Sequence, residues 1–513
     1  MSEADSTVAN PVIPGFHPDP SVCRVGADYY LACSSFEYFP GVPLFHSRDL
    51  VHWTQIGNAL DRPSQLRLSG ASSSAGIYAP TLRHHDGRFH LIVTNVSDGG
   101  NLLVTATDPA GPWSDPIRLP GVPGIDPDLA WDEDGTCWCT VAGVGQVRLD
   151  PGTGETFGPA RRIWSGSPGA KAPEAPHLYR IGEYWYLLIA EGGTERCHGV
   201  SIARGPAPSG PFEPCPHNPV LTHRGTDHPI QNTGHADLVQ GPDGSWWMVL
   251  LGVRPGGGTP GWHTLGRETF LAPVTWVDGW PVVGEVELEL PAPPWPLQPG
   301  AAGVTGAAAA EPARDDFDES ELHPRWISLR DRPVEYCATK DRPGWLTLRA
   351  RERPGSQSQS LDDLDVIFAG RRQQHLSCQV RTLIDPAEGR GGLAVRLDEQ
   401  HHYEIEAAAG TVRVVARIGS LRTEVASRPV PEGPVVLGVK IDAAKAVTDA
   451  RSGPDTVSLG VEEPDGTFTS LATLDGKYLS TEVAGGFTGR VLGMYAAEGA
   501  VHFDWFDYEP LDG

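Results

Sequence analysis

A short phrase recurs five times in the first half of the chain, and it constrains the fold more than any other feature. Each copy is one residue followed by Pro or Ala, any residue, then Leu or Val, with a Gly six to eight positions after the Pro or Ala. Counted from the Pro or Ala, the copies are 60, 47, 49 and 60 residues apart. A unit that repeats about every 50 residues is typical of a propeller or a solenoid. The copies are Asp19–Val22, Ala79–Leu82, Asp126–Leu129, Ala175–Leu178 and His235–Leu238.

Aromatic, β-branched runs follow the copies, such as Tyr29–Cys33, Phe89–Val93 and Tyr184–Ile189, and Asp-Gly turns bound several of them. Five units of short strands predict a five-bladed β-propeller over residues 1–290. Because equivalent positions of a closed ring converge on its axis, we expect side chains of the phrase to share one pocket.

The phrase is absent from the rest of the chain. Residues 291–313 are rich in Pro, Ala and Gly, which predicts a linker. Alternating strands then resume, for example Trp345–Ala350 and Thr411–Ile418, and predict a β-sandwich over residues 314–513. The predicted fold is therefore all-β, a five-bladed β-propeller followed by a C-terminal β-sandwich, with no amphipathic helix.

Charge and composition exclude some partners. The formal net charge of −25 argues against nucleic acid and anionic membranes, which select basic surfaces. Residues Met1–Asn10 are polar without an apolar core, so we expect no signal peptide and a cytoplasmic location, unless a leader has been removed. The eight cysteines are scattered, which favours free thiols over a disulfide framework or a zinc site. The oligomeric state is not predicted.

Three acidic residues occupy or adjoin the phrase: Asp19, Asp126 and, one place before the fourth copy, Glu174. One acidic residue beside a proline is more often a turn or cap residue. Three at equivalent ring positions indicate function, because carboxylates crowded in a dry pocket repel one another. Carboxyl groups that face each other suit glycoside hydrolysis, in which one donates a proton and another activates water. A third would raise the pKa of the acid.

Aromatic side chains such as Phe36, Tyr78 and Trp131 would offer apolar faces to sugar rings, although each is also a candidate for the core.

Taken together, these segments resemble glycoside hydrolase family 43, especially its β-xylosidase and α-L-arabinofuranosidase members. The match extends over the whole predicted propeller, and the C-terminal region is similar to the β-sandwich of the longer members. The matching segments are Asn10–Val22, Ser34–Trp53, Gly76–Leu91, Gly124–Gly135, Pro173–Thr194, Gly234–Gly252, Leu265–Val283 and, in the sandwich, Phe368–His375.

The resemblance implies inverting hydrolysis. Asp19 would be the general base, Glu174 the general acid, and Asp126 would tune and orient the acid. The carboxyls of base and acid would then lie roughly 6.5–9.5 Å apart, which leaves room for one water.

The resemblance also implies residues that bind the substrate. Arg267 would hydrogen-bond sugar hydroxyls or an acidic neighbour, and Phe36 would wall the sugar site, with Tyr78 beside it. His235 matches a position that in some relatives helps to hold a calcium ion or an ordered water; a buried histidine without metal is the alternative. No cofactor is required, and Ca²⁺ in the central channel is possible.

Two positions depart from the family pattern. Tyr78 stands where many xylosidases carry Trp, so the wall of the sugar pocket differs and the identity of the sugar is not fixed by the resemblance. Ala175 stands where the family has Gly, and this adds only a methyl group unless the backbone there needs a positive φ.

The predicted function is an exo-acting glycosidase that releases a terminal pentose, first of all β-D-xylose from xylo-oligosaccharides. An α-L-arabinofuranosidase is the alternative within the class. A catalytically silent, carbohydrate-binding propeller is the alternative from another class, and a structural or partner-binding propeller is a third.

Overall fold

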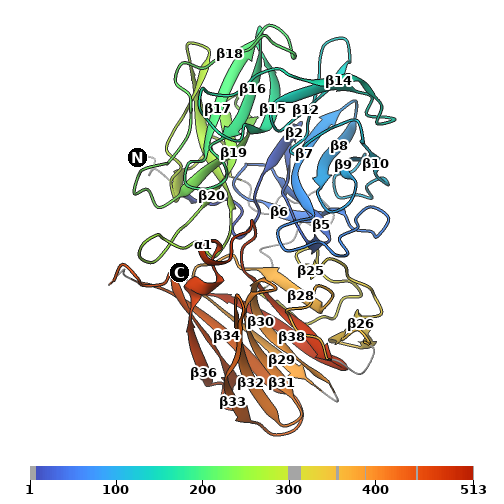
Figure 1. The fold of residues 1–513 in the computed structure, drawn as a ribbon, viewed down its shortest axis with the longest axis vertical. Coiled ribbons are helices and arrows are strands. Elements are labelled where there is room, and N and C mark those ends of the chain that lie inside the picture. Colours follow the sequence, from blue (N-terminus) through green and yellow to red (C-terminus); the bar gives the residue numbers. More distant parts are fainter. Residues whose placement is uncertain (1–6, 298–312, 354–357, 387–388, 446–448, 512–513) are drawn as a thin grey trace.

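The computed structural model describes residues 7–297, 313–353, 358–386, 389–445 and 449–511. Within these ranges almost all regular structure is β-strand, and helix is limited to the short η1 (Gly476–Leu479) and α1 (Thr481–Ala484). The chain forms two units, drawn blue to green and yellow to red in Figure 1. No helix in the described ranges has the length and apolar character needed to cross a membrane.

The N-terminal unit contains five four-stranded antiparallel sheets. Consecutive strands pair within each sheet, apart from the two-residue β4, which lies outside the first one. In chain order the sheets are β2 (Ser21–Val25), β3 (Asp28–Ala32), β5 (Gly41–Ser47), β6 (Thr54–Leu60); β7 (Ile77–His85), β8 (Arg88–Asn95), β9 (Gly100–Ala106), β10 (Ile117–Arg118); β11 (Asp128–Trp131), β12 (Cys137–Val141), β13 (Gly145–Leu149), β14 (Thr156–Arg162); β15 (Glu174–Ile181), β16 (Tyr184–Glu191), β17 (Gly199–Gly205), β18 (Glu213–Pro214); and β19 (Gln231–Gln240), β20 (Trp246–Val253), β21 (Glu268–Val277), β22 (Trp280–Val283).

The first strands of the five sheets contact one another in cyclic order. Strand β2 contacts β7, β7 contacts β11, β11 contacts β15, β15 contacts β19, and β19 returns to β2. The ends of the unit are also joined, because β1 (Thr7–Ala9) pairs with β23 (Glu289–Pro291). The segment after β1 then runs along β21, where Ile13 forms a bridge with Thr269. These contacts bring the copies of the repeated phrase around one axis.

The backbone is kinked where the phrase begins. In four of the five copies the first residue has a left-handed φ: 59° at Asp19, 52° at Asp126, 50° at Ala175 and 46° at His235. Register shifts accompany the kink in several sheets, for example between Glu174 and the third residue of its copy. A bulge of this kind re-aims side chains at the end of a ladder. The catalytic candidates therefore sit at the kinks, where the side chains leave the sheet.

The C-terminal unit is a β-sandwich. Its two antiparallel sheets enclose one apolar core, to which both contribute, and β24 (Arg314–Asp315) pairs with β38. The first sheet, in spatial order, is β26 (Cys337–Arg342), β27 (Trp345–Arg349), β38 (Ala500–Pro510), β29 (Cys378–Asp385), β34 (Val435–Ala443), β35 (Asp455–Glu462), β36 (Phe468–Asp475). The second is β28 (Ile367–Arg372), β37 (Val491–Glu498), β30 (Arg390–Asp398), β31 (His401–Ala408), β32 (Thr411–Ile418), β33 (Leu421–Pro429).

The two units share a buried interface. Strand β4 (Tyr38–Phe39) of the first pairs with β25 (Ser328–Leu329) of the second. One apolar cluster includes Phe36 and Tyr38 from the first unit together with Phe368 and Tyr495 from the second. Arg396 is fully buried at this contact and donates to the Tyr38 hydroxyl at 3.2 Å. Helix α1 lies at the same boundary (Figure 1).

The predicted linker, residues 291–313, falls mostly on positions outside the described ranges, so its boundaries stay predictions. All eight cysteines are free, and Cys197 is the exposed one.

Candidate active site

Seven of the eight side chains that the sequence singled out line one cavity of about 280 Å³, which we call the acidic cavity. They come from the starts of the inner strands and from the loops beside them. The seven are Asp19, Phe36, Tyr78, Asp126, Glu174, His235 and Arg267.

Asp19 is held on both carboxylate oxygens. The Arg267 guanidinium donates to Oδ1 at 3.0 Å, and the Ser34 hydroxyl donates to Oδ2 at 2.5 Å. Nδ1 of His235 lies 3.4 Å from Oδ1. Burial alone would raise the pKa of Asp19, but Arg267, His235 and Ser34 outweigh it, and the pKa is lowered. Asp19 is therefore an ionised, firmly oriented carboxylate.

Glu174 and Asp126 have the opposite electrostatic character. Burial first, and then the charge of Asp19, raise the pKa of Glu174 to about 7. The pKa of Asp126 is raised well above its usual value by burial, by Glu174 and by Asp19. One Asp126 oxygen accepts a hydrogen bond from the Ala175 backbone at 3.2 Å. The cavity thus combines one ionised carboxylate with carboxyl groups that hold a proton near neutral pH, a separation typical of acid–base pairs.

Three aromatic rings wall the cavity on one side. Phe36 and Phe487 are stacked with centroids 6.0 Å apart, and Tyr78 packs edge-on against both, at 5.9 Å from Phe36 and 6.0 Å from Phe487. The Arg267 guanidinium lies over the rings of Phe36 and Phe487, at 5.7 and 5.3 Å from their centroids. The rings leave an apolar face beside the carboxylates, which suits a sugar ring.

Phe487 belongs to the C-terminal sandwich, and the sequence analysis did not identify it. Its backbone N–H donates to the Ser74 hydroxyl at 2.8 Å. Six residues earlier the same segment forms α1, where the Glu482 carboxylate accepts from the backbone N–H of His263 at 2.8 Å and lies 2.7 Å from its Nδ1. Glu482 and Ser74 therefore fix the segment that carries Phe487 to the N-terminal unit. The one signal in the sequence is the pair of glycines before Phe487.

A second cavity of about 440 Å³ adjoins the first at the boundary of the two units. Both cavities are lined by Thr194, Glu195, Arg267 and Phe487. The rim of the acidic cavity carries the exposed ion pair of Lys171 and Glu195, 3.1 Å apart. A chain longer than one sugar has room beyond the acidic cavity.

The surroundings of His235 do not fit a calcium ion bound directly by the protein. Calcium takes six to eight oxygen ligands, whereas Asp19 is already paired with Arg267. Deeper along the axis, Asp128 and Asp237 are both paired with the Arg83 guanidinium at 2.8 Å. Burial lowers the pKa of His235 to about 3, so its imidazole is neutral. The site fits the alternative of a buried histidine, and no step below depends on calcium.

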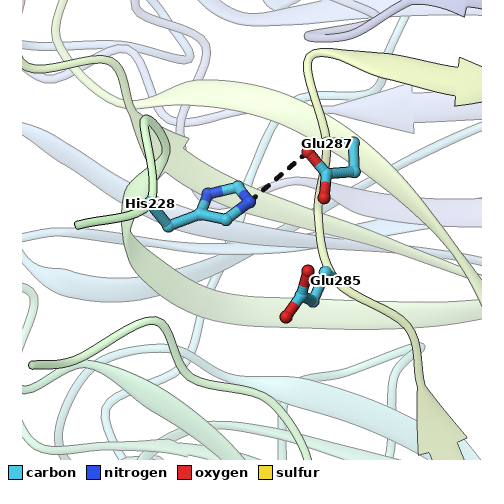
Figure 2. A group of neighbouring side chains, drawn as sticks. All are labelled: His228, Glu285 and Glu287. Carbon is cyan, nitrogen blue, oxygen red and sulfur yellow. Dashed lines mark ion pairs between the residues drawn. The ribbon is translucent and has the colours of Figure 1, made fainter. Parts of the chain in front are cut away.

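Another group of ligand-type side chains lies away from the acidic cavity. His228, Glu285 and Glu287 each offer one atom within 4.8 Å of the others. Figure 2 shows the His228 ring directed at Glu287, with Nε2 and Oε2 3.5 Å apart. Both glutamates are exposed, and none of the three lines the acidic cavity. An ion pair accounts for the contact.

One condition that the sequence left open is met, and one expectation is wrong. Ala175 has φ of 50°, so the backbone does need the left-handed region, and the alanine does more there than add a methyl group. Trp131 does not line the acidic cavity; it is the last residue of β11 and lines a different cavity.

The comparisons with known proteins agree with this geometry. The model of "Glycosyl hydrolases family 43" matches residues 8–281, and that of "Beta xylosidase C-terminal Concanavalin A-like domain" matches residues 314–509. The chain is 39% identical to a non-reducing end alpha-L-arabinofuranosidase of Bacteroides ovatus, over 100% of this chain and 96% of that protein. It is 38% identical to a xylosidase/arabinosidase of Butyrivibrio fibrisolvens, over 97% of this chain and 98% of that protein. A solved Bacteroides ovatus structure, "Xyloglucan PUL GH43B", superposes with a TM-score of 0.88 at 38% identity, covering 99% of this chain and 100% of that one.

Proposed function

The chain belongs to glycoside hydrolase family 43, and from that premise we propose that it is an exo-acting, inverting glycosidase that releases a terminal pentose from oligosaccharides. The favoured substrate class is β-D-xylosides. The observation that carries the proposal is the joint location of Asp19, Asp126 and Glu174 in one cavity with their pKa values moved in opposite directions.

Asp19 and Glu174 would divide the proton transfers. The Asp19 carboxylate, ionised and oriented by Arg267 and Ser34, accepts a proton from water as the water oxygen bonds to the anomeric carbon. Glu174, whose pKa is about 7, donates its proton to the glycosidic oxygen as that bond breaks. Asp126 would help to orient Glu174, because it accepts a hydrogen bond from the backbone N–H of Ala175, the next residue along the chain, at 3.2 Å. Attack on the face opposite the leaving group inverts the anomeric centre.

The form of the cavity supports exo action. Its volume of about 280 Å³ suits a single sugar ring, and Phe487 from the sandwich closes the wall beside Phe36 and Tyr78. A chain that continued past the non-reducing end would meet this wall. The rest of the substrate would extend from the rim that Glu195 and Lys171 form.

We further propose that the five four-stranded sheets are the blades of a five-bladed propeller whose axis passes through the acidic cavity. The cyclic contacts of β2, β7, β11, β15 and β19 support this arrangement. The sandwich would act as a fixed wall of the site.

The stereochemistry of the product tests the proposal. Proton NMR of a nitrophenyl β-D-xyloside reaction should show the α-anomer of xylose first, before mutarotation. The β-anomer as first product would overturn the inverting mechanism. Release of oligosaccharides by cleavage of internal bonds of a long chain would overturn exo action.

An α-L-arabinofuranosidase is the second candidate, because the Butyrivibrio fibrisolvens relative carries both names and the Bacteroides ovatus relative is named an arabinofuranosidase. The same carboxylates serve both sugars. Comparison of kcat/KM for nitrophenyl β-D-xyloside and nitrophenyl α-L-arabinofuranoside decides between them.

A silent carbohydrate-binding propeller would need no proton donor. Replacing Glu174 with Ala separates this reading from catalysis, because an enzyme loses turnover while retaining pentose binding. A wild-type protein that binds the sugar in calorimetry and hydrolyses neither pentoside would favour the silent propeller.

A further inference from the structure

The loop between β6 and β7 connects the two residues whose rings are stacked in the wall of the acidic cavity. We call residues 69–76 the Ser74 loop. Directly after it, Ile77 exchanges backbone hydrogen bonds with Phe36, at 2.9 and 3.0 Å. Within it, the Ser74 hydroxyl accepts a hydrogen bond from the backbone N–H of Phe487 at 2.8 Å. The loop therefore joins Phe36 of the N-terminal unit to Phe487 of the sandwich, whose ring centroids lie 6.0 Å apart.

A buried carboxylate holds the backbone of Ser74. Glu37, the residue after Phe36, is fully buried, and its Oε2 accepts a hydrogen bond from the backbone N–H of Ser74 at 2.9 Å. Nη1 of Arg396, which is also fully buried, lies 3.9 Å from Oε1 of Glu37. Ser74 has a φ of 63°, in the left-handed region that is unfavourable for a residue with a side chain. Such a backbone persists where its surroundings fix it, and the contact with Glu37 does so here.

The sandwich holds the residues that precede Ser74. Nε of Arg330 donates to the backbone oxygen of Ala71 at 2.5 Å. The Ser73 hydroxyl donates to the Glu399 carboxylate at 2.6 Å. Arg330 and Arg396 both form ion pairs with Glu399, so this carboxylate is itself fixed. The Ser74 loop is therefore a rigid support, although it contains little regular structure.

The segment that carries Phe487 has no such rigidity of its own. Gly485 and Gly486 precede the ring with φ of 77° and 82°, and glycine adopts many other backbone conformations as readily. The fit to Ser74 is close, because a Cβ on Gly486 would lie 2.5 Å from the Ser74 hydroxyl oxygen. Glycine thus lets the hydroxyl reach the N–H of Phe487. The hydrogen bond then selects the conformation in which the ring stacks on Phe36.

We propose that Ser74 is a positioning residue of the sugar site. Its hydroxyl fixes the Phe487 ring relative to Phe36, and Glu37 fixes the hydroxyl. Without the hydroxyl, the two glycines let the ring move away from Phe36, and the sugar loses an apolar wall. Ser74 itself lines neither the acidic cavity nor the adjoining one, so affinity for the sugar depends on it more than proton transfer does. The inference rests on the proposed function, because it takes a pentose as the ligand of the acidic cavity.

The first test compares Ser74→Gly with Ser74→Ala. Both remove the hydroxyl, and both should raise the KM for the nitrophenyl pentoside that the parent cleaves by about two- to tenfold, the effect of one lost hydrogen bond, with kcat nearly unchanged. Ser74→Ala should have the lower Tm of the two, because alanine adopts a φ of 63° less readily than glycine. A purely structural role predicts instead that KM follows Tm. A KM that rises in Ser74→Ala alone, or in neither variant, would overturn the proposal.

The second test repeats Ser74→Gly in a chain that carries Phe487→Ala. No ring is left to position, so the substitution should cause no further rise in KM. A rise as large as in the parent would show that Ser74 acts through another group and would overturn the proposal. Ser72→Ala is the matched control, because Ser72 is an exposed serine of the same loop that lines neither cavity. It should leave KM and Tm unchanged.

Failure of the proposed hydrolysis would be seen separately, as a parent protein that cleaves no pentoside. In that case calorimetry with D-xylose makes the same comparison without turnover. Ser74→Gly should weaken the affinity for D-xylose by about two- to tenfold, and Ser72→Ala should not change it. Equal affinities of the parent and Ser74→Gly would overturn the positioning role of Ser74.

Discussion

Arg267 donates to Oδ1 of Asp19 at 3.0 Å, although the two residues lie 248 positions apart in the sequence. The contact joins the first copy of the repeated phrase to the start of β21 in the fifth sheet. It orients the proposed base and keeps it ionised. It also lowers the pKa of Glu174 relative to what burial and Asp19 alone would give. One guanidinium therefore acts on both ends of the proposed proton transfer.

Replacing Glu174 with Gln should lower kcat by at least about 100-fold on an alkyl pentoside, because the leaving oxygen then departs without a proton. The loss should be much smaller on a dinitrophenyl pentoside, whose leaving group needs no acid. Steady-state kinetics on the two substrates measures the difference. Glu195→Gln is the control, since Glu195 lines the same cavity but pairs with Lys171 at the rim. Equal losses on both substrates would remove Glu174 from the acid role.

The pH profile of kcat/KM should have an alkaline limb near pH 7 and an acid limb below about pH 4. The alkaline limb follows because Glu174, with a pKa of about 7, must be protonated to act. The acid limb follows because Asp19, whose pKa is lowered from 3.8, must be ionised. Removing the positive charge with Arg267→Met should raise both pKa values and move both limbs to higher pH.

Arg267→Lys is the control for that shift, because it retains the charge. Limbs of Arg267→Met that stay in place, or that move apart, would contradict this electrostatic account.

Phe487→Ala should lower kcat/KM by about tenfold or more, mainly through a higher KM, because the sugar loses one apolar wall. Glu482→Gln should have a smaller effect in the same direction, since it weakens the contact of α1 with His263. Val483→Ala, on the same helix and 41% exposed, should leave the kinetics unchanged. Unaltered kinetics of Phe487→Ala would mean that the sandwich does not contact substrate.

Ala175→Gly should raise the free energy of unfolding by about 0.5–1 kcal/mol. The left-handed φ of 50° costs an alanine about 1–2 kcal/mol, and the greater freedom of glycine in the unfolded chain offsets part of the gain. Denaturant unfolding measures the change. A Gly variant less stable than the parent would show that Ala175 is not strained.

Arg83→Met should destabilise the N-terminal unit by about 3–5 kcal/mol, because it leaves Asp128 and Asp237 buried without their counter-ion. Arg180→Met breaks an exposed ion pair with Glu133, in which the charged groups lie 3.9 Å apart. It should lower the free energy of unfolding by less than about 1 kcal/mol. Thermal unfolding compares the two.

Acid unfolding adds a second measure of the same contact. Arg83 is the first of the groups that lower the pKa of Asp237 to about 2 against the cost of burial. A lowered folded-state pKa contributes stability that is present above about pH 4 and is lost as the pH falls toward 2. In Arg83→Met the free energy of unfolding should fall less steeply as the pH decreases over this range. An unchanged dependence on pH would count against the pairing of Arg83 with Asp237.

The repeated phrase predicted the grouping of the catalytic candidates because it marks one position relative to the inner strand. Residues at or beside the same offset in each sheet come together, whatever their distance along the chain. Asp19 and Asp126 hold one offset and Glu174 lies one position before it, so the three line one cavity. Trp131 lies five positions after Asp126. The short strand β11 carries it to the other end of the sheet, so an aromatic in a matching segment was assigned to the wrong cavity.

The repeated phrase could not predict two other features of the site. Phe487 reaches the acidic cavity through packing of one unit on the other, which no repeat within the first unit encodes. The φ of Ala175 depends on the kink at its strand start, and alanine gives no sign of it, because glycine is the residue that ordinarily marks such a backbone.

The interface that buries Arg396 and the shared cluster around Phe36 has a consequence for the evolution of the chain. A module joined only by a linker can be exchanged for another by recombination without damage to its neighbour. Here the same exchange would remove part of the sugar pocket and leave charged groups without counterparts. Substitutions in either unit can therefore change the shape of the pocket, and with it the preference for one sugar over another.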